Sequence, residues 1–220
     1  MMSASIVPTR ALALANGHAI FLDCAADRYF ALSPNENDAL LRLLAGSRIS
    51  AREQRALLGA TGVEATTTNF RALLAVRETE APLRASIASS APGLAARLSA
   101  IRHLFGAKIR LGMTGFHATL ESLARIRRLS PSLELEAGHG ASRIAGAHDW
   151  LSRHFTANDA CLLRSLALAY HLRSSGCAAQ LVIAVRTDPF AAHCWVESGD
   201  RVLNEELDAV ASFEPILFVR

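Results

Sequence analysis

The 220-residue chain lacks several features that would assign it to a familiar class of site. Lys108 is its only lysine, and the net charge of +3 leaves acidic residues almost as numerous as basic ones. This balance does not indicate a nucleic-acid partner. The four cysteines form no Cys-x-x-Cys pair, which argues against a compact zinc site and gives little support to a disulfide framework. We therefore expect no bound metal and no nucleic acid.

Signals for membranes and export are also missing. The first residues show no signal-peptide pattern, and no uncharged apolar run approaches the roughly 20 residues needed to span a bilayer. Hydrophobic residues make up 51% of the chain, which is ample for a packed core. We expect a cytoplasmic protein with free thiols and no membrane partner.

The first eighty residues have the pattern of three short strands followed by three helices. Residues 11–32 are rich in strand formers and carry turn signals at Asn16-Gly17 and near 25–27. Apolar residues then recur at helical spacing in three segments, covering about 35–44, 50–59 and 66–78. This order of elements predicts a winged-helix-like domain over residues 1–80.

A change of composition separates this region from the rest of the chain. Pro82, Pro92 and many small residues predict a linker over residues 81–93. Further helical patterns follow at about 94–105 and 114–129, and a third precedes Phe155. We therefore expect a second domain over residues 94–220.

Residues 158–177, NDACLLRSLALAYHLRSSGC, have the pattern of one amphipathic helix with marked ends. Asn158 or Asp159 fits the N-cap, and Gly176 fits a left-handed C-terminal residue. Cys161 then lies in the first turn, where unpaired N–H groups and the helix dipole favour a thiolate. Without a base nearby, however, a buried and inert cysteine explains the pattern equally well.

A predicted hairpin downstream supplies a base. Gln180–Val185 predicts a buried strand, and two more strands follow around 198–200. A three-residue loop over 198–200 places His193 opposite Glu205, whereas a two-residue loop places it opposite Glu206. The three-residue loop is favoured because it also forms one ion pair and one apolar pair, Glu197–Arg201 and Trp195–Leu203.

Cysteine, histidine and a carboxylate are together the parts of a nucleophile–base–orienter set. In this set Cys161 attacks, His193 carries the proton, and Glu205 holds the imidazole. His171 lies too far along the helix of Cys161 to serve as the base. His148 and His154 remain alternatives to His193.

Two stretches carry a resemblance to a known family. CLLRSLALAYHLRSSGCAAQLVIAV followed by AHCWVESGDRVLNE resembles the leader peptidases of lasso-peptide biosynthesis, which are transglutaminase-like cysteine proteases with a papain-type arrangement. The resemblance implies Cys161 as nucleophile and His193 as base. The family usually has an aspartate where this chain has Glu205, so the identity of the orienting residue stays open.

The N-terminal segment AIFLDCAADRYFALSPNENDALLRLLAG is similar to the leader-recognition element of such pathways. The resemblance implies that a leader peptide adds as a strand beside the third strand and packs against the third helix. The peptide-binding residues that follow from it are Arg28, Tyr29, Phe30, Ala31 and Leu32 on the strand, and Phe70, Leu73 and Arg77 on the helix.

The expected fold is therefore α+β, with a winged-helix-like recognition domain joined to a papain/transglutaminase-like cysteine protease domain. The resemblance implies a peptidase that removes the leader of a ribosomally made lasso-peptide precursor without a cofactor. An asparagine-synthetase-like cyclase is the implied partner.

Three other functions remain open. One is a non-catalytic leader-binding chaperone with a degenerate protease domain, and another is transglutaminase-type acyl transfer. The third, a winged-helix DNA-binding regulator, is disfavoured because the third helix offers only Arg71 and Arg77 as basic residues.

Overall fold

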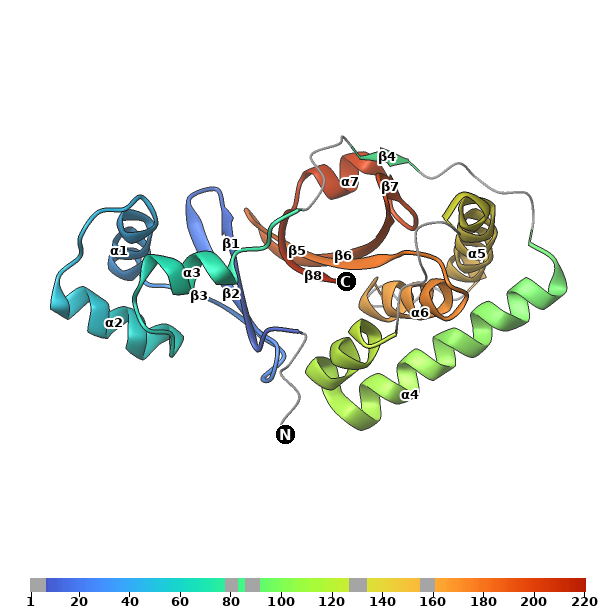
Figure 1. The fold of residues 1–220 in the computed structure, drawn as a ribbon, viewed down its shortest axis with the longest axis horizontal. Coiled ribbons are helices and arrows are strands. Elements are labelled where there is room, and N and C mark those ends of the chain that lie inside the picture. Colours follow the sequence, from blue (N-terminus) through green and yellow to red (C-terminus); the bar gives the residue numbers. More distant parts are fainter. Residues whose placement is uncertain (1–6, 78–82, 86–91, 127–133, 155–160) are drawn as a thin grey trace.

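The computed structural model describes residues 7–77, 83–85, 92–126, 134–154 and 161–220 (Figure 1). Its strands are β1 Arg10–Ala15, β2 His18–Asp23, β3 Arg28–Ala31, β4 Arg84–Ala85, β5 Gln180–Thr187, β6 Phe190–Ser198, β7 Arg201–Val202 and β8 Glu214–Val219. Its helices are α1 Pro34–Leu44, α2 Ala51–Thr61, α3 Thr67–Leu73, α4 Leu94–Ala124, α5 Glu134–His154, α6 Cys161–Ser174 and α7 Leu207–Ala211. The architecture is mixed α and β, which confirms the expected α+β class. None of the described helices combines the length and apolar character that crossing a membrane requires.

The N-terminal region forms a three-stranded antiparallel sheet in the order β1-β2-β3. Asn16 and Gly17 both have positive φ in the turn between β1 and β2, as the sequence signal predicts. The next turn is held by the carboxylate of Asp23, which accepts bonds from the backbone N–H groups of Ala25 and Ala26. Strand β3 is left at one edge of this sheet.

Helices α1 and α2 begin at capping boxes. Ser33 pairs with Glu36 at the first, and Ser50 pairs with Glu53 at the second. Helix α3 is shorter than the sequence predicts, because it ends at Leu73 and Leu74 then bridges to Leu12 on β1. The predicted helix over about 66–78 is therefore wrong from Leu74 to Arg77, and residue 78 lies outside the described residues.

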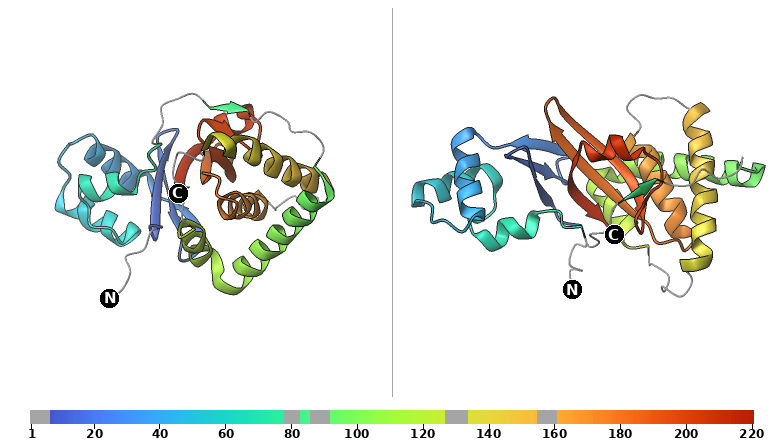
Figure 2. Two further views of the ribbon diagram at one scale, coloured as in Figure 1. Left: turned by 45° about the vertical axis from the view of Figure 1, so that its right-hand side comes forward. Right: turned by 90° about the horizontal axis from the view of Figure 1, so that it is seen from above.

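The C-terminal region is built on a five-stranded sheet in the order β4-β7-β6-β5-β8, with α4, α5 and α6 packed together beside it (Figures 1 and 2). The sequence predicts two helices in the stretch that α4 occupies. The structure has one long element that turns at Gly115, whose φ of 77° breaks the helical path. Helix α7 and strand β8 were not predicted from the sequence.

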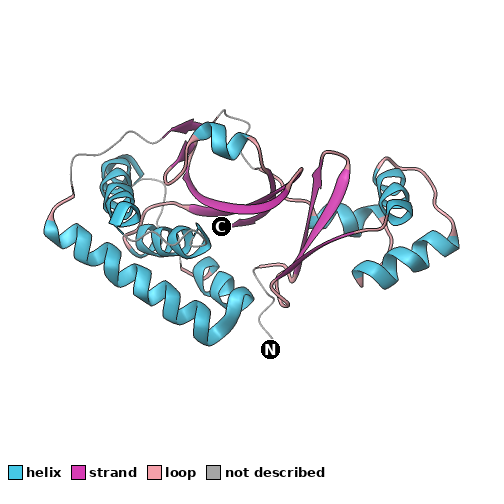
Figure 3. Ribbon diagram, turned by 180° about the vertical axis from the view of Figure 1, so that it is seen from behind, coloured by secondary structure: helices cyan, strands magenta, loops and turns pink. Residues whose placement is uncertain are grey.

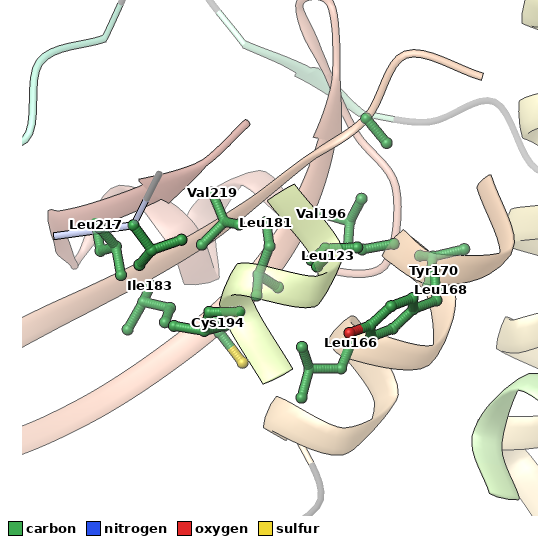
Figure 4. Close-up of a cluster of buried hydrophobic side chains, with 14 of the residues drawn as sticks. Leu123, Leu166, Leu168, Tyr170, Leu181, Ile183, Cys194, Val196, Leu217 and Val219 are labelled. Carbon is green, nitrogen blue, oxygen red and sulfur yellow. The ribbon is translucent and has the colours of Figure 1, made fainter. Parts of the chain in front are cut away.

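The two regions are not independent of each other. Figure 3 shows the two sheets as neighbouring strand layers near the middle of the molecule. Side chains alternate along the N-terminal sheet, so that Leu12 and Phe21 pack towards α1–α3. Ala13, Ile20 and Leu22, on the opposite face, join the core of the C-terminal region, part of which is shown in Figure 4. One continuous hydrophobic core therefore joins both regions.

The predicted linker is partly structured. Arg84–Ala85 forms β4, which pairs in parallel with β7 at the edge of the C-terminal sheet. Arg84 also forms an ion pair with Asp200, at 3.2 Å between Nε and Oδ2. The rest of residues 81–93 lies mainly outside the described residues. The division into residues 1–80, 81–93 and 94–220 stays a prediction.

Candidate active site

Helix α6 begins at Cys161 and carries that thiol at its first turn. The predicted N-cap residues Asn158 and Asp159 lie outside the described residues. The helix ends as the sequence predicts, with Gly176 at a φ of 80°. Behind the first turn, the Ser165 hydroxyl donates to the backbone oxygen of Cys194 on β6 at 3.0 Å. This bond fixes the start of α6 against the strand that carries His193.

The hairpin register differs from the favoured prediction. Glu197 pairs with Val202 and Ser198 with Arg201, so the loop is the two-residue Gly199-Asp200. Gly199 has a φ of 60°, and glycine at this first position is typical of a tight hairpin turn. The predicted Glu197–Arg201 and Trp195–Leu203 pairs are therefore wrong.

Glu205 nevertheless contacts His193, because β7 is short. Strand pairing ends after Val202, and the Asn204 side chain then accepts the backbone N–H of Val196 at 2.8 Å. Asn204 also donates to the Ser165 hydroxyl at 2.9 Å. With the chain turned at Asn204, the Glu205 Oε1 lies 3.1 Å from the His193 Nε2. Glu206 is exposed at the start of α7, so the structure places Glu205 and not Glu206 beside the imidazole.

The thiol of Cys161 is surrounded by groups that stabilise its anion. Hydrogen bonds from Cys194 and then from His193 lower its pKa from 9.0 to about 4, against the opposing effect of burial. The backbone N–H of Leu162 contributes in the same direction. The side chain of Cys161 is therefore a thiolate at neutral pH.

His193 is the complementary cation. Its hydrogen bonds to Cys161 and then to Glu205 raise its pKa from 6.5 to about 9, although burial opposes the shift. The bond to Cys161 and burial raise the pKa of Cys194 well above its ordinary value, so Cys194 stays a neutral thiol that donates to the thiolate. A thiolate–imidazolium pair oriented by a carboxylate is the arrangement required for nucleophilic attack.

His148 and His171 form a separate cluster with Ser99. His148 donates to or accepts from His171 at 3.1 Å, and His171 bonds the Ser99 hydroxyl at 3.0 Å. Burial lowers the pKa of His148 to about 3. The side chain of His154 lies outside the described residues. No group of three or more potential metal ligands occurs in the described part of the chain.

The predicted peptide-binding residues do not form one continuous surface. Arg28–Ala31 forms the edge strand β3, and Leu32 follows it half-buried. Phe70 is fully buried against Phe21, and Leu73 is half-buried in the same core. These positions leave the edge of β3, and not α3, as the accessible part of the set.

Arg77 lies beyond α3 and serves a different contact. Its guanidinium donates two bonds to the Glu197 carboxylate, at 2.6 and 3.0 Å. Glu197 is completely buried and also accepts bonds from Gln180 and from the indole of Trp195. Arg77 thus ties the N-terminal region to the strand of His193.

A pocket of about 760 Å³ opens beside the edge of β3. Its walls come from both regions: Ile20, Tyr29 and Ala31 from the N-terminal sheet, and Thr187, Asp188 and Phe190 from the turn between β5 and β6. The rings of Tyr29 and Phe190 meet edge to face at 5.8 Å.

Sequence reasoning missed the residues that support the site. Ser165 lies four residues after Cys161 on the same helix face, and Cys194 follows His193 directly on β6, where the side chains of both bond to the Cys161 sulfur. Both positions were visible in the pattern as neighbours of the site. The role of Asn204 was not, because it depends on where strand pairing stops.

Comparisons with known proteins agree with this geometry. The family model described as the transglutaminase-like superfamily matches residues 101–218, which is more than half of the chain. A 45-residue segment is 51% identical to the microcin J25-processing protein McjB of Escherichia coli. That match covers 20% of this chain and 22% of the relative. No solved structure matches the chain significantly.

Proposed function

Because the chain belongs to the transglutaminase-like superfamily, we propose that it is a cysteine peptidase that removes the leader from a lasso-peptide precursor. The observation that carries the proposal is the bonding of the Cys161 sulfur to His193, whose Nε2 lies 3.1 Å from Glu205. The similarity to a microcin-processing protein supports the precursor as the substrate class.

The proposed reaction has two steps, formation of a thioester and its hydrolysis, and His193 transfers a proton in each. The Cys161 thiolate attacks the scissile carbonyl carbon, and His193 gives its proton to the leaving amine of the core peptide. The neutral imidazole then takes a proton from water, which attacks the thioester and releases the leader as a carboxylic acid. Glu205 keeps the imidazole oriented through both steps. The products are a free leader and a core peptide with a free α-amine, ready for a cyclase.

Leader capture is proposed at the edge of β3. An unpaired edge strand offers backbone donors and acceptors to an extended peptide, and adjacent pockets select its side chains. The pocket beside Tyr29 and Phe190 suits an apolar leader side chain, because its walls are largely aromatic and aliphatic. Thr187, Asp188 and Phe190 on its other side lie at the β5–β6 turn, and β6 also carries His193.

Incubation with the precursor peptide encoded in the same gene neighbourhood tests the proposal. We expect cleavage at a single bond, with masses that sum to the precursor plus one water. Transglutaminase-type acyl transfer would instead give a cross-linked or amidated product with no hydrolysed carboxylate. Binding without any cleavage would favour the chaperone alternative.

The dependence of kcat/KM on pH follows from the two shifted pKa values. Activity should rise with pH through an acid limb near 4, as Cys161 loses its proton. It should fall through a basic limb near 9, as His193 loses its proton. Between the limbs we expect a plateau, because the ion pair is the main form of the free enzyme there. A narrow optimum centred above pH 9 would contradict the ion pair.

Replacing Glu205 by Gln should lower cleavage about a hundredfold, because the amide no longer stabilises the imidazolium. The basic limb of the pH profile should move to lower pH, a change that a purely structural role would not produce. Glu205→Asp should keep part of the activity, since the carboxylate is retained. The matched control Glu206→Gln should behave like the parent, and equal losses in both Gln variants would argue against Glu205 as the orienting residue.

A further inference from the structure

Helix α4 presents an unusual outer face. Five large apolar side chains on it are exposed: Leu94 by 73%, Leu98 by 57%, Phe105 by 58%, Ile109 by 58% and Met113 by 80%. Their spacing of four, seven, four and four residues places them along one stripe of the helix. Contiguous apolar surface of this kind marks an interaction site more often than scattered exposed residues do.

The opposite face of α4 explains why the stripe points outwards. Ala100 and Ala107 are buried, and the His103 ring stacks on His171 of α6 at 4.1 Å between centroids. Figure 1 shows α4 along the border of the molecule, with α5 and α6 on its inner side. The stripe is therefore held rigidly and faces away from the packed elements.

Charge identifies the kind of partner. Residues 81–120 contain no aspartate or glutamate, although the chain has 20 acidic residues in all. Arg102, Lys108 and Arg110 are exposed on the same part of α4. A partner that covers this face of α4 must therefore offer an apolar surface to the stripe and negative charge to the basic residues beside it.

We propose that residues 94–113 of α4 bind the interface of a membrane that contains anionic lipids. Up to the break at Gly115 the helix is about 30 Å long at the usual rise, and it forms a convex ridge suited to a flat, fluid surface. Its apolar stripe enters the acyl boundary, while Arg102 and Lys108 reach the headgroups. The lack of a long apolar run, from which no membrane partner was expected, excludes a spanning segment but not a helix that lies on a membrane surface.

A second copy of the chain fits this face of α4 less well than an anionic membrane does. Two such faces would bring Arg102 and Lys108 of one molecule against the same cations of the other, with no acidic residue in either stretch to neutralise them. An acidic protein groove would satisfy the charge, but it would need a concave shape along the whole ridge.

Sedimentation of the full chain with lipid vesicles tests the inference. We expect binding to vesicles of phosphatidylcholine with phosphatidylglycerol, little binding to phosphatidylcholine alone, and release by salt. The double variant F105S/I109S should weaken binding at least about tenfold. R102E/K108E should abolish it, and, being a surface change, should leave the circular dichroism spectrum intact.

The matched control is Leu58→Ser, which removes an exposed leucine of α2 (47% exposed) and should bind vesicles like the parent. A parent chain that binds neither vesicle overturns the inference and leaves an acidic protein as the occupant. Binding that is equal for the parent and both double variants overturns it too, because the contact would then lie elsewhere. None of these outcomes depends on whether the protein cleaves a leader.

Discussion

Replacing Cys161 by Ala is expected to abolish leader cleavage, with a loss of about ten-thousandfold in single-turnover rate. The reason is chemical: no other described nucleophile bonds to His193 in place of this thiolate. Leader affinity should change little, because the proposed binding edge on β3 belongs to another part of the structure. Single-turnover cleavage and a binding titration of the same variant measure the two effects separately.

Two cysteines serve as matched controls for this experiment. Cys24 and Cys177 are buried and are not among the groups that shift the pKa of Cys161, and burial raises the pKa of both thiols, so their Ala variants should cleave nearly normally. Cys194 is not a neutral control, because its thiol donates to Cys161; its Ala variant should move the acid limb of the profile to higher pH. Substantial cleavage by Cys161→Ala would remove this residue from the mechanism.

Replacing Arg77 by Ala is expected to lower the free energy of unfolding by about 3–5 kcal/mol. The change leaves the Glu197 carboxylate completely buried without the cation that meets both of its oxygens. The remaining bonds from Gln180 and Trp195 do not neutralise its charge. Urea unfolding at neutral pH measures the loss.

An exposed pair provides the comparison. Arg153 and Asp149 form an ion pair across one turn of α5 with side chains 73% and 57% exposed, and Arg153→Ala should cost only about 0.5 kcal/mol or less. In the double variant R77A/E197Q the loss should be smaller than in Arg77→Ala alone, since the uncompensated charge is gone. If Arg77→Ala unfolded with the same midpoint as Arg153→Ala, the buried pair would contribute no net stability.

Local signals in the sequence predicted much of the fold. The Asn16-Gly17 turn, the helix that begins near residue 50 and the glycine at position 176 each depend on a few neighbouring residues, and all three are present. The strands β5 and β6 follow from continuous β-branched and alternating patterns. The residues of the candidate site were also predicted, since Cys161, His193 and Glu205 lie together in the structure.

Long-range contacts explain what the sequence could not predict. The three-residue hairpin loop was favoured because Glu197 and Arg201 are complementary neighbours in the chain. Glu197 instead meets Arg77, which is 120 residues away, and no local pattern indicates that choice. The shortness of β7 likewise depends on Asn204 reaching Ser165 on α6. A cross-strand pair contributes roughly 0.2–1 kcal/mol, whereas leaving a buried carboxylate without its cation costs about 3–5 kcal/mol.

The shared core bears on what would happen if the chain were divided into two polypeptides. Dividing the chain between Arg77 and Leu83 would expose an apolar surface on each fragment. On the N-terminal fragment this surface includes Ala13, Ile20 and Leu22. Such surfaces resemble the interfaces of obligate subunits and not those of transient complexes. The two fragments should therefore be insoluble when expressed separately. When co-expressed they should form a soluble complex, in which Arg77 and Glu197 form an ion pair between the fragments.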